Sequence, residues 1–148
     1  MEPLSKDFKE FIELLNENKV EYLLVGGYAV ILYGSPRFTG DIDFWVKLEE
    51  KNIKKVIKVI KDFGLTSFDV SVDKLSQPNQ IIQLGYSPYR IDIITSVSGV
   101  EFDDCKKNAK IFEIDDIQIN VIGFEDLLVN KKASGRHKDL DDVSNLEK

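Results

Sequence analysis

Two aspartates separated by one residue, Asp41 and Asp43, are the side chains most informative about chemistry. They open the stretch 41–47, whose alternation predicts a strand. Side chains two residues apart on a strand share a face, so we expect the two carboxylates side by side and Ile42 facing the core. Such a pair is costly unless a cation neutralises it, and Mg²⁺ prefers carboxylate and phosphate oxygens. The alternative is an exposed acidic strand start, the commoner case for an isolated Asp-x-Asp.

A third acidic residue, Asp92, lies in the otherwise apolar stretch 89–95. A carboxylate between two isoleucines needs a partner if its strand is central. On a strand next to Asp41 and Asp43 it would complete a site for two divalent ions. The alternative is that Asp92 faces solvent on a half-exposed sheet. The three aspartates are therefore candidate catalytic residues and candidate ligands of two Mg²⁺ ions, with Mn²⁺ as a substitute.

A glycine pair, Gly26-Gly27, ends an apolar run and precedes a predicted helix. Glycine lets a backbone approach a phosphate closely, and the amides at a helix start favour an anion. Most such pairs are only tight turns, but this one comes one helix before the acidic strand. Arg37 and Thr39 lie in the intervening loop. Both are candidate nucleotide-binding residues, and Arg37 could contact a phosphate or the carboxylates. The alternatives are a solvated arginine and a threonine that only caps the turn.

The C-terminal segment offers cations and acids around a glycine break. Lys131 is a candidate contact to triphosphate oxygens as a point charge. Arg136, Asp139 and Asp142 are candidate supporting residues. The alternative is a solvated, charge-rich helix. His137 has no second histidine or cysteine nearby, so a zinc site is not expected.

Periodic patterns predict the elements that must position these residues. Expected strands are 22–25, 41–47, 80–84, 89–95, and a hairpin of 110–113 and 117–121 around Asp115-Asp116. Expected helices are one that Ser5 caps and that fades at 16–18, and others at 28–33, 49–63, 124–134 and 138–146. Residues 65–78 give no clear pattern. The order predicts an α/β (α+β) fold, a mixed sheet flanked by helices, as one domain over 1–148.

Composition narrows the class of protein. Apolar residues make up 43% of the 148 residues, an ordinary globular share, and no apolar run is long enough to span a membrane. Cys105 is the single cysteine, which suits a reducing cytoplasm, so we expect a cytoplasmic location and no membrane partner. The net charge of −6 argues against a broad electrostatic grip on nucleic acid.

The front pattern comprises 24–29 (Leu-Val-Gly-Gly-Tyr-Ala), Gly34, Arg37, Thr39 and Asp41-Ile42-Asp43, and the back pattern comprises 130–140 with Asp142. Together they resemble the polymerase-beta-like nucleotidyltransferase superfamily over about residues 8–146, most of all the small bacterial AbiEii-type and minimal nucleotidyltransferases. The front pattern is also similar to the start of lincosamide nucleotidyltransferases. One departure is Gly27, where many superfamily members have serine.

The resemblance implies a nucleotidyltransferase fold and transfer of NMP from an NTP, with ATP as the first choice, to an acceptor hydroxyl. It implies a phosphate-loop role for Gly26 and Gly27, metal ligation by Asp41, Asp43 and Asp92, and triphosphate contact by Lys131. The acceptor candidates are a protein side chain, a tRNA end or a small molecule such as a lincosamide- or aminoglycoside-like antibiotic. The small size favours a partner chain or homodimer, as in a toxin–antitoxin pair. The alternative is a non-catalytic nucleotide-binding or partner-binding module of the same fold.

Overall fold

A mixed β-sheet organises the chain in the computed structural model, which describes residues 4–64, 72–85 and 89–148. Within these residues the sheet has six strands in the order β3-β4-β2-β1-β6-β5. They are β1 (Tyr22–Val25), β2 (Asp41–Val46), β3 (Ile81–Leu84), β4 (Arg90–Ile94), β5 (Lys110–Ile114) and β6 (Ile117–Val121). The pairs β2–β4 and β1–β6 are parallel, and the other neighbours are antiparallel. The predicted mixed sheet flanked by helices is therefore confirmed.

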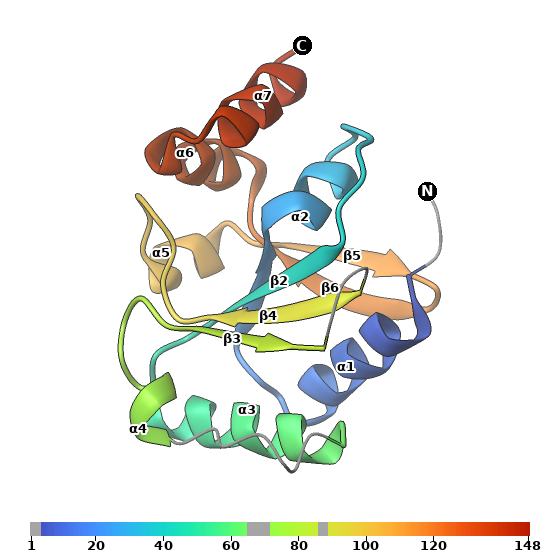
Figure 1. Cartoon of the computed structure of the whole chain (residues 1–148), viewed down its shortest axis with the longest axis vertical. Coiled ribbons are helices and arrows are strands. Elements are labelled where there is room, and N and C mark those ends of the chain that lie inside the picture. Colours follow the sequence, from blue (N-terminus) through green and yellow to red (C-terminus); the bar gives the residue numbers. More distant parts are fainter. Residues whose placement is uncertain (1–3, 65–71, 86–88) are drawn as a thin grey trace.

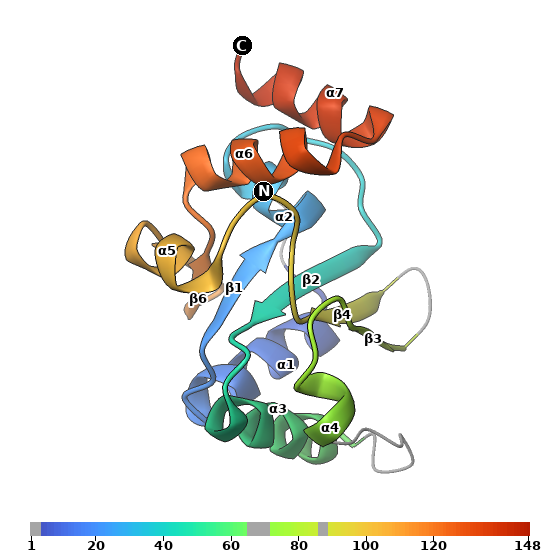
Figure 2. The same ribbon diagram turned by 90° about the vertical axis from the view of Figure 1, so that its left-hand side faces the viewer.

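Helices lie on both faces of this sheet. They are α1 (Lys6–Glu17), α2 (Gly26–Leu32), α3 (Glu50–Asp62), α4 (Val72–Leu75), α5 (Phe102–Lys107), α6 (Phe124–Ser134) and α7 (His137–Leu146). Figures 1 and 2 show α1 and α3 beneath the sheet, with α6 and α7 crossing above it on the far side. None of the helices in the described stretches is long and apolar enough to cross a bilayer.

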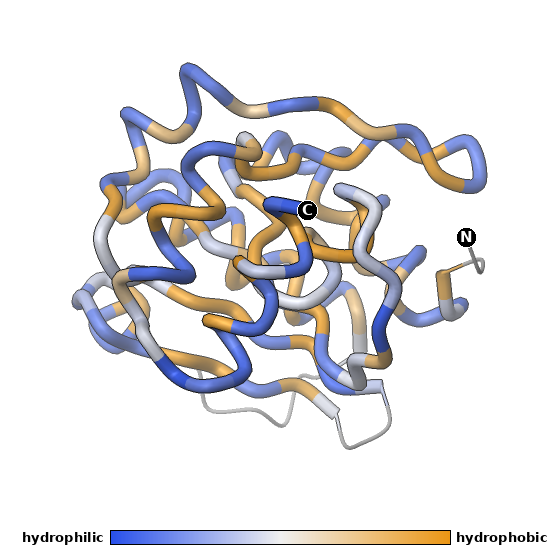
Figure 3. The backbone as a smooth tube through the Cα atoms, turned by 90° about the horizontal axis from the view of Figure 1, so that it is seen from above, coloured by the Kyte–Doolittle hydropathy of each residue, from blue (hydrophilic) through white to orange (hydrophobic). Residues whose placement is uncertain are grey.

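Strand β2 shows how the sequence divides the two faces. Ile42, Phe44 and Val46 alternate along it and are fully buried. The ring of Phe44 lies 5.6 Å from that of Phe11 on α1, so this face closes the main core. The intervening side chains, Asp41 among them, point to the opposite face, because side chains alternate along a strand. Figure 3 shows that hydrophobic and hydrophilic residues are interspersed along the whole described chain. One face of β2 is thus apolar, and the other carries Asp41 and Asp43 together with the buried Trp45.

Most predicted elements are present, with small shifts in their ends. Ser5 caps α1 by accepting a hydrogen bond from the Phe8 amide. Asp115 and Asp116 both have positive φ in the β5–β6 hairpin, as a two-residue turn of the type that matches strand twist requires. The second helix begins at Gly26, two residues before the predicted start. Residues 65–71 of the ambiguous stretch and 86–88 of the predicted turn lie outside the described residues.

Helix α5 was not predicted. It has six residues, and no side chain caps its start. Phe102 and Cys105 are its two buried residues, and the ring of Phe102 packs edge-on against Trp45 of β2. Such a short helix contains too few turns to show a periodic pattern, so only its packing against the sheet identifies it.

Candidate active site

The three predicted aspartates lie on one face of the sheet. Strands β2 and β4 run parallel, and their register pairs Asp43 with Asp92 and Asp41 with Arg90. Residues paired across neighbouring strands point to the same side, and Asp41 and Asp43 share a side through their spacing. Asp92 is buried, whereas Asp41 and Asp43 are partly exposed. Side chains about 50 residues apart in sequence are therefore brought together above the sheet.

Arg90 bridges two of these carboxylates. Its Nη2 donates to Asp41 Oδ2 at 2.9 Å and to Asp92 Oδ2 at 3.0 Å, and its Nε donates to Asp92 Oδ1 at 2.8 Å. The hydrogen bonds to Asp92 raise the pKa of Arg90 above its ordinary value, and the charges of Asp92 and Asp41 act in the same direction. Arg90 was not among the predicted site residues. Its spacing of two from Asp92 was the signal in the sequence, because that spacing puts both on one face.

Asp43 is the most crowded carboxyl group of the three. Burial raises its pKa to about 7, and the nearby charges of Asp92 and Asp41 add to the effect while Lys131 opposes it. A carboxyl group in this setting is stabilised by a cation, and carboxylate oxygens are the ligands that Mg²⁺ accepts. The donor set thus fits a divalent ion. In the described part of the chain, however, no group of three or more aspartate, glutamate, histidine or cysteine side chains is already placed to hold a metal ion.

Gly26 and Gly27 make room for the site in two different ways. Gly26 has φ +72°, and a Cβ there would lie 2.1 Å from Asp43 Oδ2. A Cβ on Gly27 would lie 2.7 Å from Arg37 Nη2 and 2.9 Å from Thr39 Oγ1. Gly26 therefore admits the Asp43 carboxylate, and Gly27 admits the loop before β2. The space that a serine would need at position 27 is occupied here by Arg37.

Substituting Gly26 with alanine is expected to lower the free energy of unfolding by more than about 2 kcal/mol, because left-handed strain of about 1 kcal/mol adds to a clash with Asp43. Gly34→Ala is the matched control. Gly34 has φ +102°, and a Cβ there would have nothing within 4 Å, so only the strain applies. Urea denaturation of both variants measures the difference. Equal losses would show that Asp43 has room to move away.

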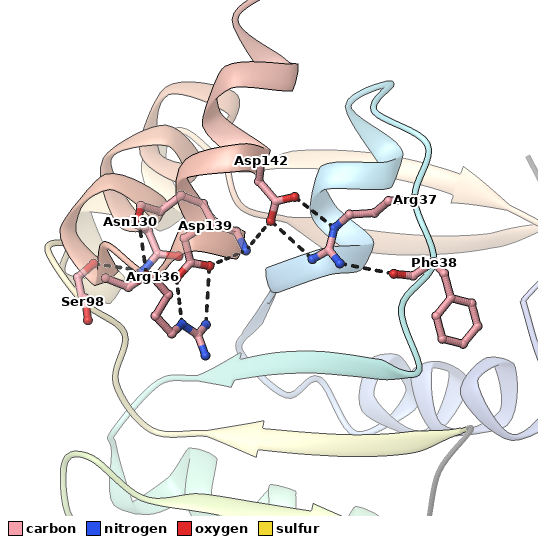
Figure 4. Close-up of polar contacts among 9 residues, drawn as sticks. Arg37, Phe38, Ser98, Asn130, Arg136, Asp139 and Asp142 are labelled. Atoms are coloured by element: carbon pink, nitrogen blue, oxygen red, sulfur yellow. Dashed lines mark hydrogen bonds and ion pairs between the residues drawn. The ribbon is translucent and has the colours of Figure 1, made fainter.

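A second polar cluster joins α6, α7 and the loop before β2 (Figure 4). Lys131 Nζ lies 3.1 Å from Asp139 Oδ1 and 3.0 Å from Asp142 Oδ2. Arg37 Nε lies 3.0 Å from Asp142 Oδ1, so Arg37 turns toward α7 and not toward the aspartates on the sheet. Burial alone would raise the pKa of Asp139, but hydrogen bonds from Arg136, Ser134 and Lys131 outweigh it and hold that pKa well below its usual range.

A cleft of about 510 Å³ separates the acidic face of the sheet from α6 and the start of α7. Among the predicted residues, five line it: Gly26, Asp43, Lys131, Arg136 and Asp139. The other predicted residues are not among those that line it: Gly27, Arg37, Thr39, Asp41, Asp92 and Asp142. Thr39 donates a hydrogen bond to the carbonyl of Asp41 at 3.3 Å, which ties the loop to the strand.

The rest of the cleft was not predicted from the sequence. Its lining combines apolar and small polar side chains and includes Asn79, Ile81, Ile94, Ser96, Ser98 and Asn130. Asn130 donates to the carbonyl of Ser98 at 3.0 Å, which joins α6 to the loop after β4 (Figure 4). The volume lies in the range of sites for nucleotide-sized ligands.

A mixed sheet with Asp-x-Asp on one strand, a third aspartate on the parallel neighbour and a glycine turn entering a helix is the arrangement that the resemblance to nucleotidyltransferases implied. The chain belongs to the family described as nucleotidyl transferase of unknown function (DUF2204), whose model matches residues 4–148. None of the curated proteins compared with the chain matches it significantly.

Solved structures share this fold. The candidate nucleotidyltransferase TM1012 from Thermotoga maritima is 16% identical, with a TM-score of 0.61 over 95% of this chain and 88% of that one. The lincosamide antibiotic adenylyltransferase LnuA, in its lincomycin-bound form, is 17% identical, with a TM-score of 0.60 over 99% and 98%. An antigenic nucleotidyltransferase-like protein from Paracoccidioides brasiliensis is 13% identical, with a TM-score of 0.57 over 98% and 78%.

Proposed function

We propose that the chain, acting as one nucleotidyltransferase domain, transfers NMP from an NTP to an acceptor hydroxyl with the help of Mg²⁺, and that ATP is the preferred donor. The observation that carries this proposal is the gathering of Asp41, Asp43 and Asp92 on one face of the sheet, beside a cleft of about 510 Å³. The cleft is lined by a glycine turn, a buried lysine and the carboxylate of Asp43, and Asp41 and Asp92 share the strand face with Asp43. These are the kinds of group that a metal–triphosphate complex requires.

In this proposal Asp41, Asp43 and Asp92 hold one or two divalent ions. When bound, Mg²⁺ (or Mn²⁺) neutralises charge on the phosphates and lowers the pKa of the acceptor hydroxyl. Asp92 takes the proton from that hydroxyl, whose oxygen then forms a bond to the α-phosphorus. The bond between the α-phosphorus and the bridging oxygen breaks, and pyrophosphate leaves with that oxygen. The protein contributes mainly position and charge, as in other reactions at phosphorus.

Lys131 is the proposed contact to the triphosphate. It lines the cleft, and its positive charge partly offsets the rise that burial causes in the pKa of Asp43. Asp139 and Asp142 hold its ammonium group from α7. Arg136 also lines the cleft and pairs with Asp139, and most of its side chain is exposed. Gly26 and Gly27 start α2, where backbone amides favour an anion. Arg37 and Thr39 support this turn from the adjoining loop.

The acceptor is a hydroxyl of a protein, a tRNA end or a small molecule. The structure of LnuA contains lincomycin and aligns with nearly the full length of both chains, which supports testing antibiotic hydroxyls as acceptors. A partner chain or second copy that completes the acceptor side, and a cytoplasmic role in a toxin–antitoxin pair of the AbiEii type, belong to the same proposal. Light scattering during turnover tests the association.

Incubation with each of four α-³²P-labelled NTPs tests the proposed reaction. The acceptor arms are cell-extract protein, tRNA, and a panel that includes lincosamides and aminoglycosides, each with Mg²⁺ or EDTA. We expect one labelled acceptor with the wild type and Mg²⁺, and none with EDTA or Asp92→Asn. Transfer at the wild-type rate by Asp92→Asn would contradict the mechanism. Tight nucleotide binding without transfer to any acceptor would favour the non-catalytic module.

A further inference from the structure

Arg90 occupies the position between two of the proposed metal ligands. Its three hydrogen bonds engage one oxygen of Asp41 and both oxygens of Asp92. The Asp92 side chain is 8% exposed and that of Arg90 is 27% exposed, so the contact is partly shielded from water. The β2–β4 register fixes it further, since Arg90 is paired directly with Asp41.

The oxygens that Arg90 engages are those a divalent ion would need. A guanidinium group stays protonated at any physiological pH, so it cannot release these oxygens by losing its charge. It can release them only by moving, and its exposed fraction of 27% leaves a path toward solvent. Its fork of donors suits two carboxylates held side by side, whereas Asp43 lies against Gly26 and interacts with Asp92.

We propose that Arg90 is a positioning residue that acts as an internal counter-cation: it holds Asp41 and Asp92 in place before a metal binds, and it competes with the divalent ion for the same oxygens. This inference rests on the proposed function, because it concerns the same three aspartates. It makes Arg90 a determinant of metal affinity, because the guanidinium group would have to swing out before Asp41 and Asp92 could hold an ion.

Arg90→Gln, Arg90→Lys and the charge-matched control Lys61→Gln test this inference. Lys61 lies exposed on α3, beneath the opposite face of the sheet. Isothermal titration with Mn²⁺ alone measures affinity, and thermal unfolding in EDTA measures the stability of the metal-free protein. We expect Arg90→Gln to unfold at a lower temperature in EDTA and to bind Mn²⁺ about tenfold more tightly, since a repelling charge is removed. Arg90→Lys should fall between it and the wild type, and Lys61→Gln should match the wild type.

A folded Arg90→Gln protein that binds Mn²⁺ as the wild type does, or more weakly, would overturn the inference while leaving the metal site intact. Absence of Mn²⁺ binding by both proteins would instead overturn the metal site of the proposed function, and this inference with it. A second measurement uses the wild type alone, in case the variant does not fold. The NMR signal of the Arg90 Nε–H group, protected by Asp92 in the metal-free protein, should lose that protection on saturation with diamagnetic Mg²⁺; unchanged protection would overturn the competition.

Discussion

Asp43→Asn is expected to lower the rate of nucleotidyl transfer by at least about 10³-fold while the chain remains folded. Asp43 is paired with Asp92 in the β2–β4 register and lines the cleft directly. Asparagine has nearly the same shape, so it removes the negative charge needed to hold a metal without opening a cavity. Since burial and two neighbouring acids raise the pKa of Asp43 to about 7, the neutral side chain should also cost little stability in the metal-free protein.

Transfer of label from an α-³²P-labelled NTP gives the rate, and thermal unfolding in EDTA shows whether the variant is folded. Asp141→Asn is the control, because Asp141 is an exposed acid on α7. It should keep the wild-type rate. If Asp43→Asn kept more than a tenth of that rate, Asp43 would have no essential part in the reaction.

Asp142→Ala is expected to lower the free energy of unfolding by about 3–5 kcal/mol, the usual cost of removing one partner from a buried ion pair. The carboxylate of Asp142 neutralises both Lys131 and Arg37, whose side chains are 6% and 18% exposed. Without it, Asp139 alone would balance Lys131, and Arg37 would keep no acidic partner among the described contacts. Urea denaturation of the metal-free protein gives the difference.

The neighbouring residue supplies the comparison for this measurement. Asp141→Ala removes an exposed carboxylate from the same turn of α7 and should change stability by less than about 0.5 kcal/mol. A cost below about 1 kcal/mol for Asp142→Ala would mean that water replaces the lost carboxylate, and that the cluster of Lys131, Asp139, Asp142 and Arg37 does not hold α7 in place.

Local patterns predicted most of the fold because the helical and strand periodicities are formed by residues close together in the sequence. Ile42, Phe44 and Val46 alternate with acids and a tryptophan on β2, which indicates a strand with one apolar face. Asp115 and Asp116 marked the hairpin turn, since their positive φ is tolerated by short acidic side chains. Helix α5 contains too little sequence for such a pattern.

The site was less predictable, because its contacts join distant segments. The shared face of Asp41 and Asp43 follows from their spacing alone. The neighbourhood of Asp92 depends on a parallel β2–β4 pairing, which connects strands far apart in sequence and has no local signature. The partners of Lys131 depend on how α7 folds back after Gly135, whose left-handed backbone (φ +67°) ends α6. Arg90 lies two residues before Asp92 on β4, and this spacing alone places both side chains on one face.

The contact of Arg37 with Asp142 spans 105 positions of the chain. It fastens the final helix to the loop that delivers the first aspartate of the acidic strand. Local opening of α7 should therefore loosen this loop as well, and the two segments should exchange their amide hydrogens as a single cooperative unit. The C-terminal helix thereby helps to hold the loop that precedes Asp41, although the two segments lie far apart in sequence.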